Sequence, residues 1–290
     1  MADFSAKDIR VEPISSTDAA KVVKRFHYSG KVVKNSQLHF GVFLNGRCEG
    51  AMQFGPSLDK RKIQGLVSAT CWNGFIELNR MAFSDKLPRF SESRALGVAF
   101  RLIRKHYPHI EWVVSFADGA QCGDGTIYRA SGFVLTGIRK NTSLWAGPNG
   151  NVIADVSVKA NPTRQIFSRT SLTDGKSKQQ QQQAQQIISR TTATKGNHTV
   201  GTNGGASMRA YKEAGFAPIP GFQLRYIYFL NQAAKERLTV PTLPFSKIEE
   251  MGAGMYRGIA RGKQAMDGNH PDSGGAAPTT TLQTETTCQD

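Results

Sequence analysis

The chain has 290 residues, with 37 Lys or Arg and 22 Asp or Glu, so its formal net charge at pH 7 is +15. That length can bury a sizeable core. No apolar run approaches the roughly eighteen residues of a membrane span, and the start of the chain lacks the basic and apolar regions of a signal peptide. The four cysteines include no CxxC pair. These features predict a cytoplasmic protein without a membrane segment.

The positive charge is unevenly distributed. Residues 264–290 include four acidic side chains and no Lys or Arg, so the first 263 residues carry a formal charge of +19. A positive field of this size favours polyanionic partners, above all nucleic acid.

The residue pattern predicts a mixed α/β (α+β) fold. A strand is expected at 9–14, a helix at 19–26, and an antiparallel meander at 38–44, 47–54 and 75–83, with Asn45–Gly46 as a hairpin turn. Leu96, Phe100, Ile103 and Tyr107 then recur at helical spacing. That helix should cross over into a buried strand at 112–116, which is apolar throughout. A short helical piece ending at Gly132 and strands at 133–137 and 222–230 complete a mixed sheet with a buried parallel strand. The order of these elements resembles that of GNAT enzymes, a choice that periodicity alone does not fix.

Composition divides the chain into four parts. Residues 1–160 should form the GNAT-like core, and residues 206–262 should add C-terminal strands and a helix to it. Residues 161–205 are basic, Gln-rich and poor in apolar side chains, which predicts a mobile insertion. The Gly-, Pro- and Thr-rich residues 263–290 predict a disordered acidic tail.

The segment Arg94–Ala99 (RALGVA) has the spacing R-x-x-G-x-A at the point where a helix is expected to begin. Amide groups at a helix N-terminus can hold an anion, and glycine allows close approach. In GNAT enzymes this anion is the pyrophosphate of coenzyme A. Glu92 departs from the pattern, because a carboxylate repels pyrophosphate, and a plain amphipathic helix is the alternative. The candidate cofactor-binding residues are Ser93, Arg94, Gly97 and Ala99.

A second motif follows the buried strand. Tyr128–Phe133 (YRASGF) is similar to the Y-x-x-x-G-F of GNAT proteins, in which the tyrosine often acts as a general acid toward the leaving group. A tyrosine packed on a helix with a C-terminal glycine cap is the structural alternative. Tyr211–Phe216 repeats the spacing. Tyr128 is preferred because it directly follows the central strand.

Several longer segments resemble the Mom proteins of Mu-like phages. They are HYSG at 27–30, ELNRMAF at 77–83, SFADG at 115–119 with CGDGTIY at 122–128, and PGFQLRYIYF at 220–229. The likeness covers about residues 10–260, apart from the Gln-rich segment. Mom proteins resemble GNAT enzymes in fold. They place a carbamoylmethyl (acetamido-type) group on the N6 amine of adenine in double-stranded DNA, and this protects the phage genome from host restriction.

The resemblance implies a set of site residues. Tyr28, Asp118, Tyr128 and His27 are the catalytic candidates. Arg80, Ser29 and Asp124 are candidates for substrate binding, although Asp124 lies in a Gly-flanked turn, where Asp is common for conformational reasons. Arg80 could equally be a surface arginine that is already satisfied. Iron is a possible cofactor, with His27 and Asp118 as the candidate ligands, but the sequence shows no HxH or HxxxD spacing.

The resemblance leaves the donor of the transferred group open. Acetyl-CoA is the default of the fold, and an aminoacyl-type donor is the alternative, because the transferred group contains an amide nitrogen. A phage protein of this kind should act in the host cytoplasm, as a monomer or a homodimer. Two other functions fit parts of the pattern: an acyl-CoA-dependent N-acetyltransferase for a small amine or a protein, and an inert DNA-binding protein that retains the GNAT shell.

Overall fold

The computed structural model describes residues 4–120, 122–147, 152–154, 212, 215–256 and 259–260. The insertion expected at 161–205, the tail expected at 263–290 and the alternative Tyr211 lie outside these residues. None of the helices in the described part of the chain is long and apolar enough to cross a membrane.

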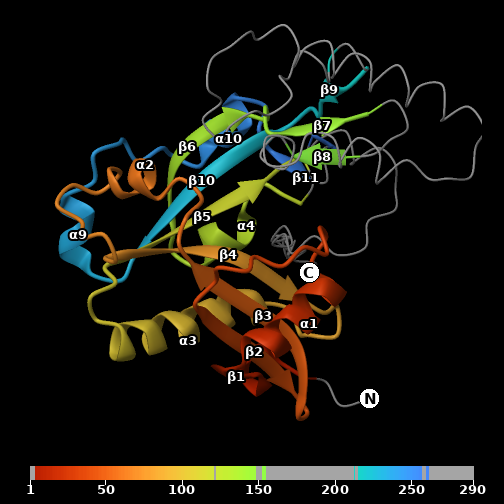
Figure 1. The fold of residues 1–290 in the computed structure, drawn as a ribbon, viewed down its shortest axis with the longest axis vertical. Coiled ribbons are helices and arrows are strands. Elements are labelled where there is room, and N and C mark those ends of the chain that lie inside the picture. Colours follow the sequence, from red (N-terminus) through yellow and green to blue (C-terminus); the bar gives the residue numbers. More distant parts are fainter. Residues whose placement is uncertain are drawn as a thin grey trace, which may run out of the picture.

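The centre of the protein is a seven-stranded sheet with the order β1-β2-β3-β4-β5-β10-β6 (Figure 1). Neighbouring strands are antiparallel except for β4 and β5, which are parallel. The mixed α/β class expected from the sequence is therefore correct. The strands of this sheet are β1 (Arg10–Pro13), β2 (Leu38–Leu44), β3 (Arg47–Gly55), β4 (Phe75–Phe83), β5 (Trp112–Asp118), β6 (Val134–Lys140) and β10 (Phe222–Phe229).

Helices of different lengths precede or connect these strands, and small sheets lie beside them. The helices are η1 (Ala6–Asp8), α1 (Ser16–Phe26), α2 (Lys60–Gln64), α3 (Ser91–His106), α4 (Thr126–Ala130), α9 (Gln232–Glu236) and α10 (Ser246–Glu250). A three-stranded sheet contains β7 (Leu144–Ala146), β8 (Val152–Ala154) and β9 (Ala217–Pro218), and a two-stranded one contains β11 (Met255–Tyr256) and β12 (Ile259–Ala260).

The arrangement from β2 to β5 is the one that the sequence predicts. β2, β3 and β4 form the antiparallel meander, and α3 crosses over to β5, which pairs in parallel with β4. α3 can lie close to the sheet because two of its core-facing positions are alanines, Ala95 and Ala99, and both are fully buried. The place of β10 could not be read from the sequence, because this strand inserts between β5 and β6 from 82 residues beyond the end of β6.

The central sheet has a core on each face. On the α3 face, Val113 and Leu224 pack with Leu96 and Phe100. On the opposite face, Trp112 and Val114 pack with residues of the α2 segment, including Ile63. The indole N–H of Trp112 donates to the hydroxyl oxygen of Thr70 at 3.0 Å. This buried hydrogen bond ties the long connection between β3 and β4 to the central strand.

Candidate active site

The site is built where β4 and β5 separate. The two strands pair only from Phe75 opposite Trp112 to Glu77 opposite Val114, and beyond these residues each strand continues without the other (Figure 1). The register between β3 and β4 shifts at the same level, which leaves Asn79 as the extra residue of a β-bulge. A bulge bends its strand. It therefore explains why β4 turns away from β5 immediately after Glu77.

The turn after α1 supplies the first functional side chains. His27 ends the helix, and its ring Nδ1 accepts the backbone N–H of Ser29 at 3.2 Å and lies 2.9 Å from the Ser29 hydroxyl. The rings of His27 and Tyr28 lie 4.3 Å apart. Arg80 on β4 holds this turn, because its Nε donates to the carbonyl oxygen of Lys31 at 2.9 Å. Arg80 also donates to the carbonyl oxygen of Asn79. These two contacts fit the satisfied arginine that the sequence left as the alternative, and substrate binding by Arg80 stays a prediction.

The end of β5 and the helix after it supply the rest of the site. The Asp118 carboxylate accepts the backbone N–H of Ala120 at 3.1 Å, which orients it at the end of the strand. Tyr128, on α4, packs against Phe133 and Tyr226. The Tyr28 hydroxyl is within electrostatic range of both Asp118 and Tyr128. Tyr28 therefore lies in the neighbourhood of both Asp118 and Tyr128, although the three residues are far apart in the sequence.

Both tyrosines keep their protons at neutral pH. Burial raises the pKa of Tyr128 to about 12, and the hydroxyl of Ser115 acts in the opposite direction. Burial of the hydroxyl end and the carboxylate of Asp118 raise the pKa of Tyr28, although 53% of that residue's surface is exposed. Each hydroxyl can therefore donate a proton, and neither is a phenolate.

Three neighbours of the tyrosines were missed as site residues in the sequence. Cys122 raises the pKa of both tyrosines, and Glu77 raises that of Tyr128. Burial in turn raises the pKa of Glu77. Ser115 is fully buried on β5. All three lie inside the segments that resemble Mom proteins, so the sequence did mark the regions that contain them. It did not show that these three residues lie near the tyrosines, because that follows from the way β4 separates from β5.

His27 is held in its neutral form. Burial, with a further contribution from the positive charge of Arg80, lowers its pKa to about 4. Among the described residues, no group of three His, Cys, Asp or Glu side chains is placed to hold a metal ion. The iron site suggested for His27 and Asp118 therefore has no support from the arrangement of these side chains.

Asp124 is buried and contacts side chains of α4 and of β10. Its side chain is 1% exposed and forms an ion pair with Arg129 at 3.1 Å, and one carboxylate oxygen lies 3.2 Å from the Thr126 hydroxyl. Its carbonyl oxygen accepts the hydroxyl of Tyr226 at 2.5 Å. These contacts favour the conformational role that the sequence left as the alternative to substrate binding.

The proposed cofactor motif was expected at the start of a helix, and its first residue, Arg94, is the fourth residue of α3. The helix begins at Ser91, and the amide of Arg94 already donates to the carbonyl of Phe90 at 3.1 Å. The amides that a helix leaves unpaired belong to its first turn. Ala99 is buried in the core, the Ser93 hydroxyl donates to the Phe90 carbonyl, and Arg94 donates to the Lys7 carbonyl at 3.4 Å. Gly97 lies on the open surface of the helix, because a Cβ added there would meet no atom within 4 Å.

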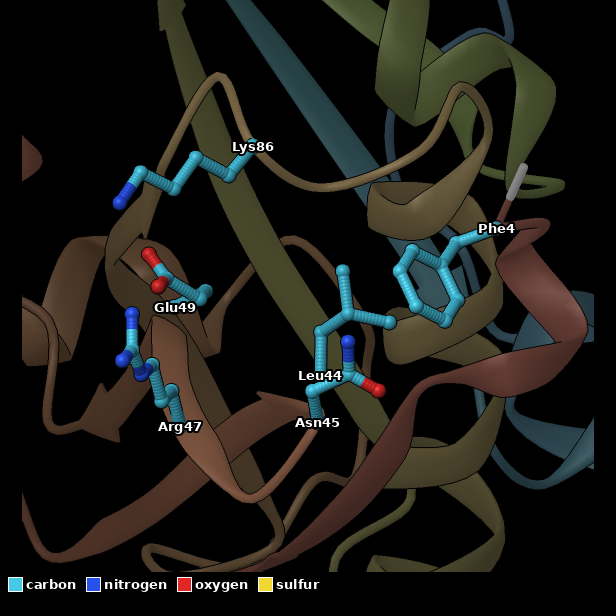
Figure 2. Close-up of a pocket in the computed structure, with 6 residues that line it drawn as sticks. All are labelled: Phe4, Leu44, Asn45, Arg47, Glu49 and Lys86. Carbon is cyan, nitrogen blue, oxygen red and sulfur yellow. The ribbon is translucent and has the colours of Figure 1, made fainter. Parts of the chain in front are cut away.

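Two hollows on the described surface lie outside the Tyr28–Asp118–Tyr128 cluster. Figure 2 shows the first, where Glu49 lies near Arg47 and Lys86 beside the end of the β2–β3 hairpin. The second runs along residues 218–222 and 140–141. Neither contains a residue of the cluster or of the Arg94–Ala99 motif. The candidate site is therefore identified from the side chains that lie near one another where β4 and β5 separate, and not from a hollow in the surface.

Comparison with known proteins decides the family. Residues 8–187, more than half of the chain, match the Mom protein family. The chain belongs to this family. The Mom relative from Escherichia phage Mu, named Methylcarbamoylase mom, is 42% identical over 140 residues. This region is 48% of the present chain and 58% of the phage Mu protein, so the match spans less than two thirds of the relative's length.

Two of the solved structures that resemble this Mom family member are acetyltransferases. The ribosomal-protein-S18-alanine N-acetyltransferase of Escherichia coli is 15% identical and covers 50% of this chain and 88% of its own, with a TM-score of 0.34. A GNAT family acetyltransferase from Elizabethkingia anophelis, with acetyl-CoA bound, is 15% identical and covers 51% and 93%, with a TM-score of 0.31. With TM-scores this low, the structural similarity supports no conclusion about the site. The fold class rests on the sheet topology described above.

Proposed function

We propose that this chain transfers a carbamoylmethyl (acetamido-type) group to the N6 amine of adenine in double-stranded DNA, and that this modification protects a phage genome from restriction. The observation that carries the proposal is the convergence of Tyr28, Asp118 and Tyr128 at the separation of β4 and β5. All three residues lie in the segments that resemble the Mom family.

The residues of the cluster suit a group transfer to an amine. The bond between the group and its donor breaks, a bond to N6 forms, and N6 loses one proton. In this proposal the carboxylate of Asp118 accepts that proton. A protonated tyrosine can supply a proton to the leaving group. Tyr128 is preferred for that role because it directly follows the central strand and its pKa responds to the buried hydroxyl of Ser115 on that strand.

The remaining residues have supporting roles in this proposal. His27 and Ser29 shape the turn that presents Tyr28, and Arg80 anchors the turn to β4. The donor is proposed to be of the acyl type, either acetyl-CoA or an aminoacyl compound. The acetyl group of acetyl-CoA contains no nitrogen for the amide of the transferred group, so with this donor a separate nitrogen source would be needed. A glycyl group has the same atoms as a carbamoylmethyl group, so an aminoacyl donor balances once its attachment shifts from the carbonyl carbon to the methylene carbon and its nitrogen shifts to the carbonyl carbon. Gly97 and the first turn of α3 are the part of the predicted cofactor segment that can face the donor. The protein would act in the host cytoplasm, and light scattering after gel filtration would test whether it forms a homodimer.

The decisive experiment analyses DNA from cells that make the protein. Plasmid DNA is digested to nucleosides, and mass spectrometry is used to look for a mass-shifted deoxyadenosine. Asp118→Asn and Tyr128→Phe each remove one proposed proton-transfer group with little change in shape, and each should reduce the product by about 100-fold or more. Tyr107→Phe, at the exposed end of α3, is the matched control and should retain full activity. Unaltered nucleosides from cells rich in wild-type protein would refute the proposal.

A further inference from the structure

One face of the sheet is only half covered by the described residues. Cross-strand register places Trp112 and Val114 of β5 on the same face as Ile227 of β10, and all three are buried with the α2 segment. The α2 segment does not cover the next residue of β5 on this face, Phe116. Phe116 is 41% exposed, although β5 is an interior strand of a seven-stranded sheet.

Two arginines lie beside Phe116 on this face. Arg225 of β10 is directly opposite Phe116, and Gln223 is opposite Asp118. On the far side of β10, Gln223 pairs with Arg139 of β6, which places Arg139 on the same face. The guanidinium of Arg225 lies across Gly137 and donates to the carbonyl oxygen of Thr136 at 2.8 Å. The backbone therefore holds Arg225 in place.

The two arginines are close enough to repel each other. Burial, and then the charge of Arg139, lower the pKa of Arg225. Within the described part of the chain, no ion pair joins either arginine to a carboxylate. Two neighbouring cations without an acidic partner favour an anionic ligand, and a guanidinium matches the geometry of a phosphate.

We propose that the surface formed by Phe116, Gln223, Arg225 and Arg139 binds the DNA strand that carries the target base. Phe116 stacks on a base, and the two arginines contact phosphates beside it. An exposed aromatic ring next to cations is the arrangement that binds unpaired nucleotides. The surface adjoins Asp118, two residues beyond Phe116 on the same strand face, so a strand held there passes the catalytic carboxylate. This inference rests on the proposed function and adds the surface that holds the substrate.

The test measures DNA binding by the full-length protein, with no donor present. Fluorescence anisotropy is recorded with a labelled 20-nucleotide single strand and with the corresponding duplex, over a series of salt concentrations. Arg139→Ala should weaken binding and reduce the slope of log affinity against log salt by roughly 0.7 for the single strand and roughly 0.9 for the duplex, the value for one lost phosphate contact. Arg101→Ala, an exposed arginine of α3 on the opposite face, is the matched control and should leave the slope unchanged.

Phe116 is tested by a different signature. Phe116→Leu keeps an apolar side chain but removes the ring, and it should weaken single-strand binding by about 5- to 100-fold with the salt slope unchanged. Phe116→Trp should bind as tightly as the wild type or more tightly. Thermal unfolding of each variant shows that the fold is intact. Wild-type affinity and slope in both Arg139→Ala and Phe116→Leu would overturn the inference.

The two proposals fail in different ways. If cells that make the wild-type protein contain the modified deoxyadenosine but the variants bind DNA as the wild type does, this surface is not the interface and the proposed function stands. If the wild-type protein leaves nucleosides unaltered while the variants lose DNA binding as described, the surface is a DNA interface and the proposed activity is wrong.

Discussion

At the scale of single residues, the turn at 27–29 shows how backbone contacts set the protonation of a side chain. Nδ1 of His27 accepts the N–H of Ser29, which a protonated ring could not do. Burial and the charge of Arg80 also act against the imidazolium. The neutral ring is therefore part of the folded structure, and this has a consequence for stability.

We predict that His27 makes the protein less stable in mild acid. Its pKa is about 4 in the folded chain, against an ordinary value of 6.5, so the unfolded chain binds the proton first as the pH falls below 6.5. At pH 5 the loss from this residue should be about 1–2 kcal/mol, allowing for solvent screening. Urea denaturation at pH 7 and pH 5 measures it. His27→Gln should remove this part of the loss, whereas His109→Gln, which changes an exposed histidine, should retain it. Equal losses in the wild type and His27→Gln would contradict the assignment.

A second residue-scale prediction concerns Asp124. Arg129→Ala removes the cation from a carboxylate that is 1% exposed, and it should lower the free energy of unfolding by about 2–4 kcal/mol. Lys21→Ala breaks the exposed pair with Asp18, where the side chains are 73% and 56% exposed, and it should cost far less because solvent screens this pair. Denaturant titration compares the two. If Arg129→Ala costs no more than Lys21→Ala, Asp124 does not depend on this partner.

At the scale of elements, the long connection between β3 and β4 contains one short helix, α2. Hydrogen bonds to other parts of the protein hold this connection in place, and helical propensity contributes little. α2 has five residues, and Ile63 is its only buried one. The bonds that fix the segment come from elsewhere: Trp112 donates to Thr70, and Arg237 donates to the Ser68 carbonyl. A five-residue helix is marginal by itself. This is why sequence periodicity did not reveal it.

Thr70→Val tests this anchoring. The substitution keeps the shape of the side chain but leaves the buried indole N–H of Trp112 without its acceptor, which should cost about 1–3 kcal/mol of unfolding free energy. Ser68→Ala is the control, because its hydroxyl bonds an exposed carbonyl, that of Arg237, and its loss should cost less than about 0.5 kcal/mol. Chemical denaturation followed by Trp fluorescence measures both. Equal effects would mean that the Trp112 bond does not hold the segment.

At the scale of the whole molecule, charge should dominate DNA binding. With a formal charge of +15, and two or more phosphate contacts, affinity for duplex DNA should fall at least about tenfold between 50 and 200 mM salt. Anisotropy with a labelled duplex measures this. A variant ending at Lys263 lacks four acidic residues and should bind more tightly at 50 mM salt. An affinity independent of salt would show that the positive charge is not used for DNA.

The sequence alone determined the meander, the long helix and the buried strand. Each of these depends on local periodicity, and each is found within a few residues of its expected bounds. The family could also be recognised from the sequence, because several segments resemble those of Mom proteins and occur in the same order. Among the site residues named from the sequence, Tyr28 lies within electrostatic range of Asp118 and Tyr128, and the roles of all three remain a proposal.

The tertiary structure decided what local patterns cannot contain. β10 reaches its place between β5 and β6 through pairing over more than eighty residues, and only that pairing puts Arg225 beside Phe116. The bulge at Asn79 separates β4 from β5 and so opens the site, yet nothing in the spacing of ELNRMAF indicates it. The R-x-x-G-x-A motif was expected at a helix start and lies within the helix, because α3 begins three residues earlier, at Ser91. Side-chain chemistry follows from residue type, but which groups share a site follows from strand register and from where strands part.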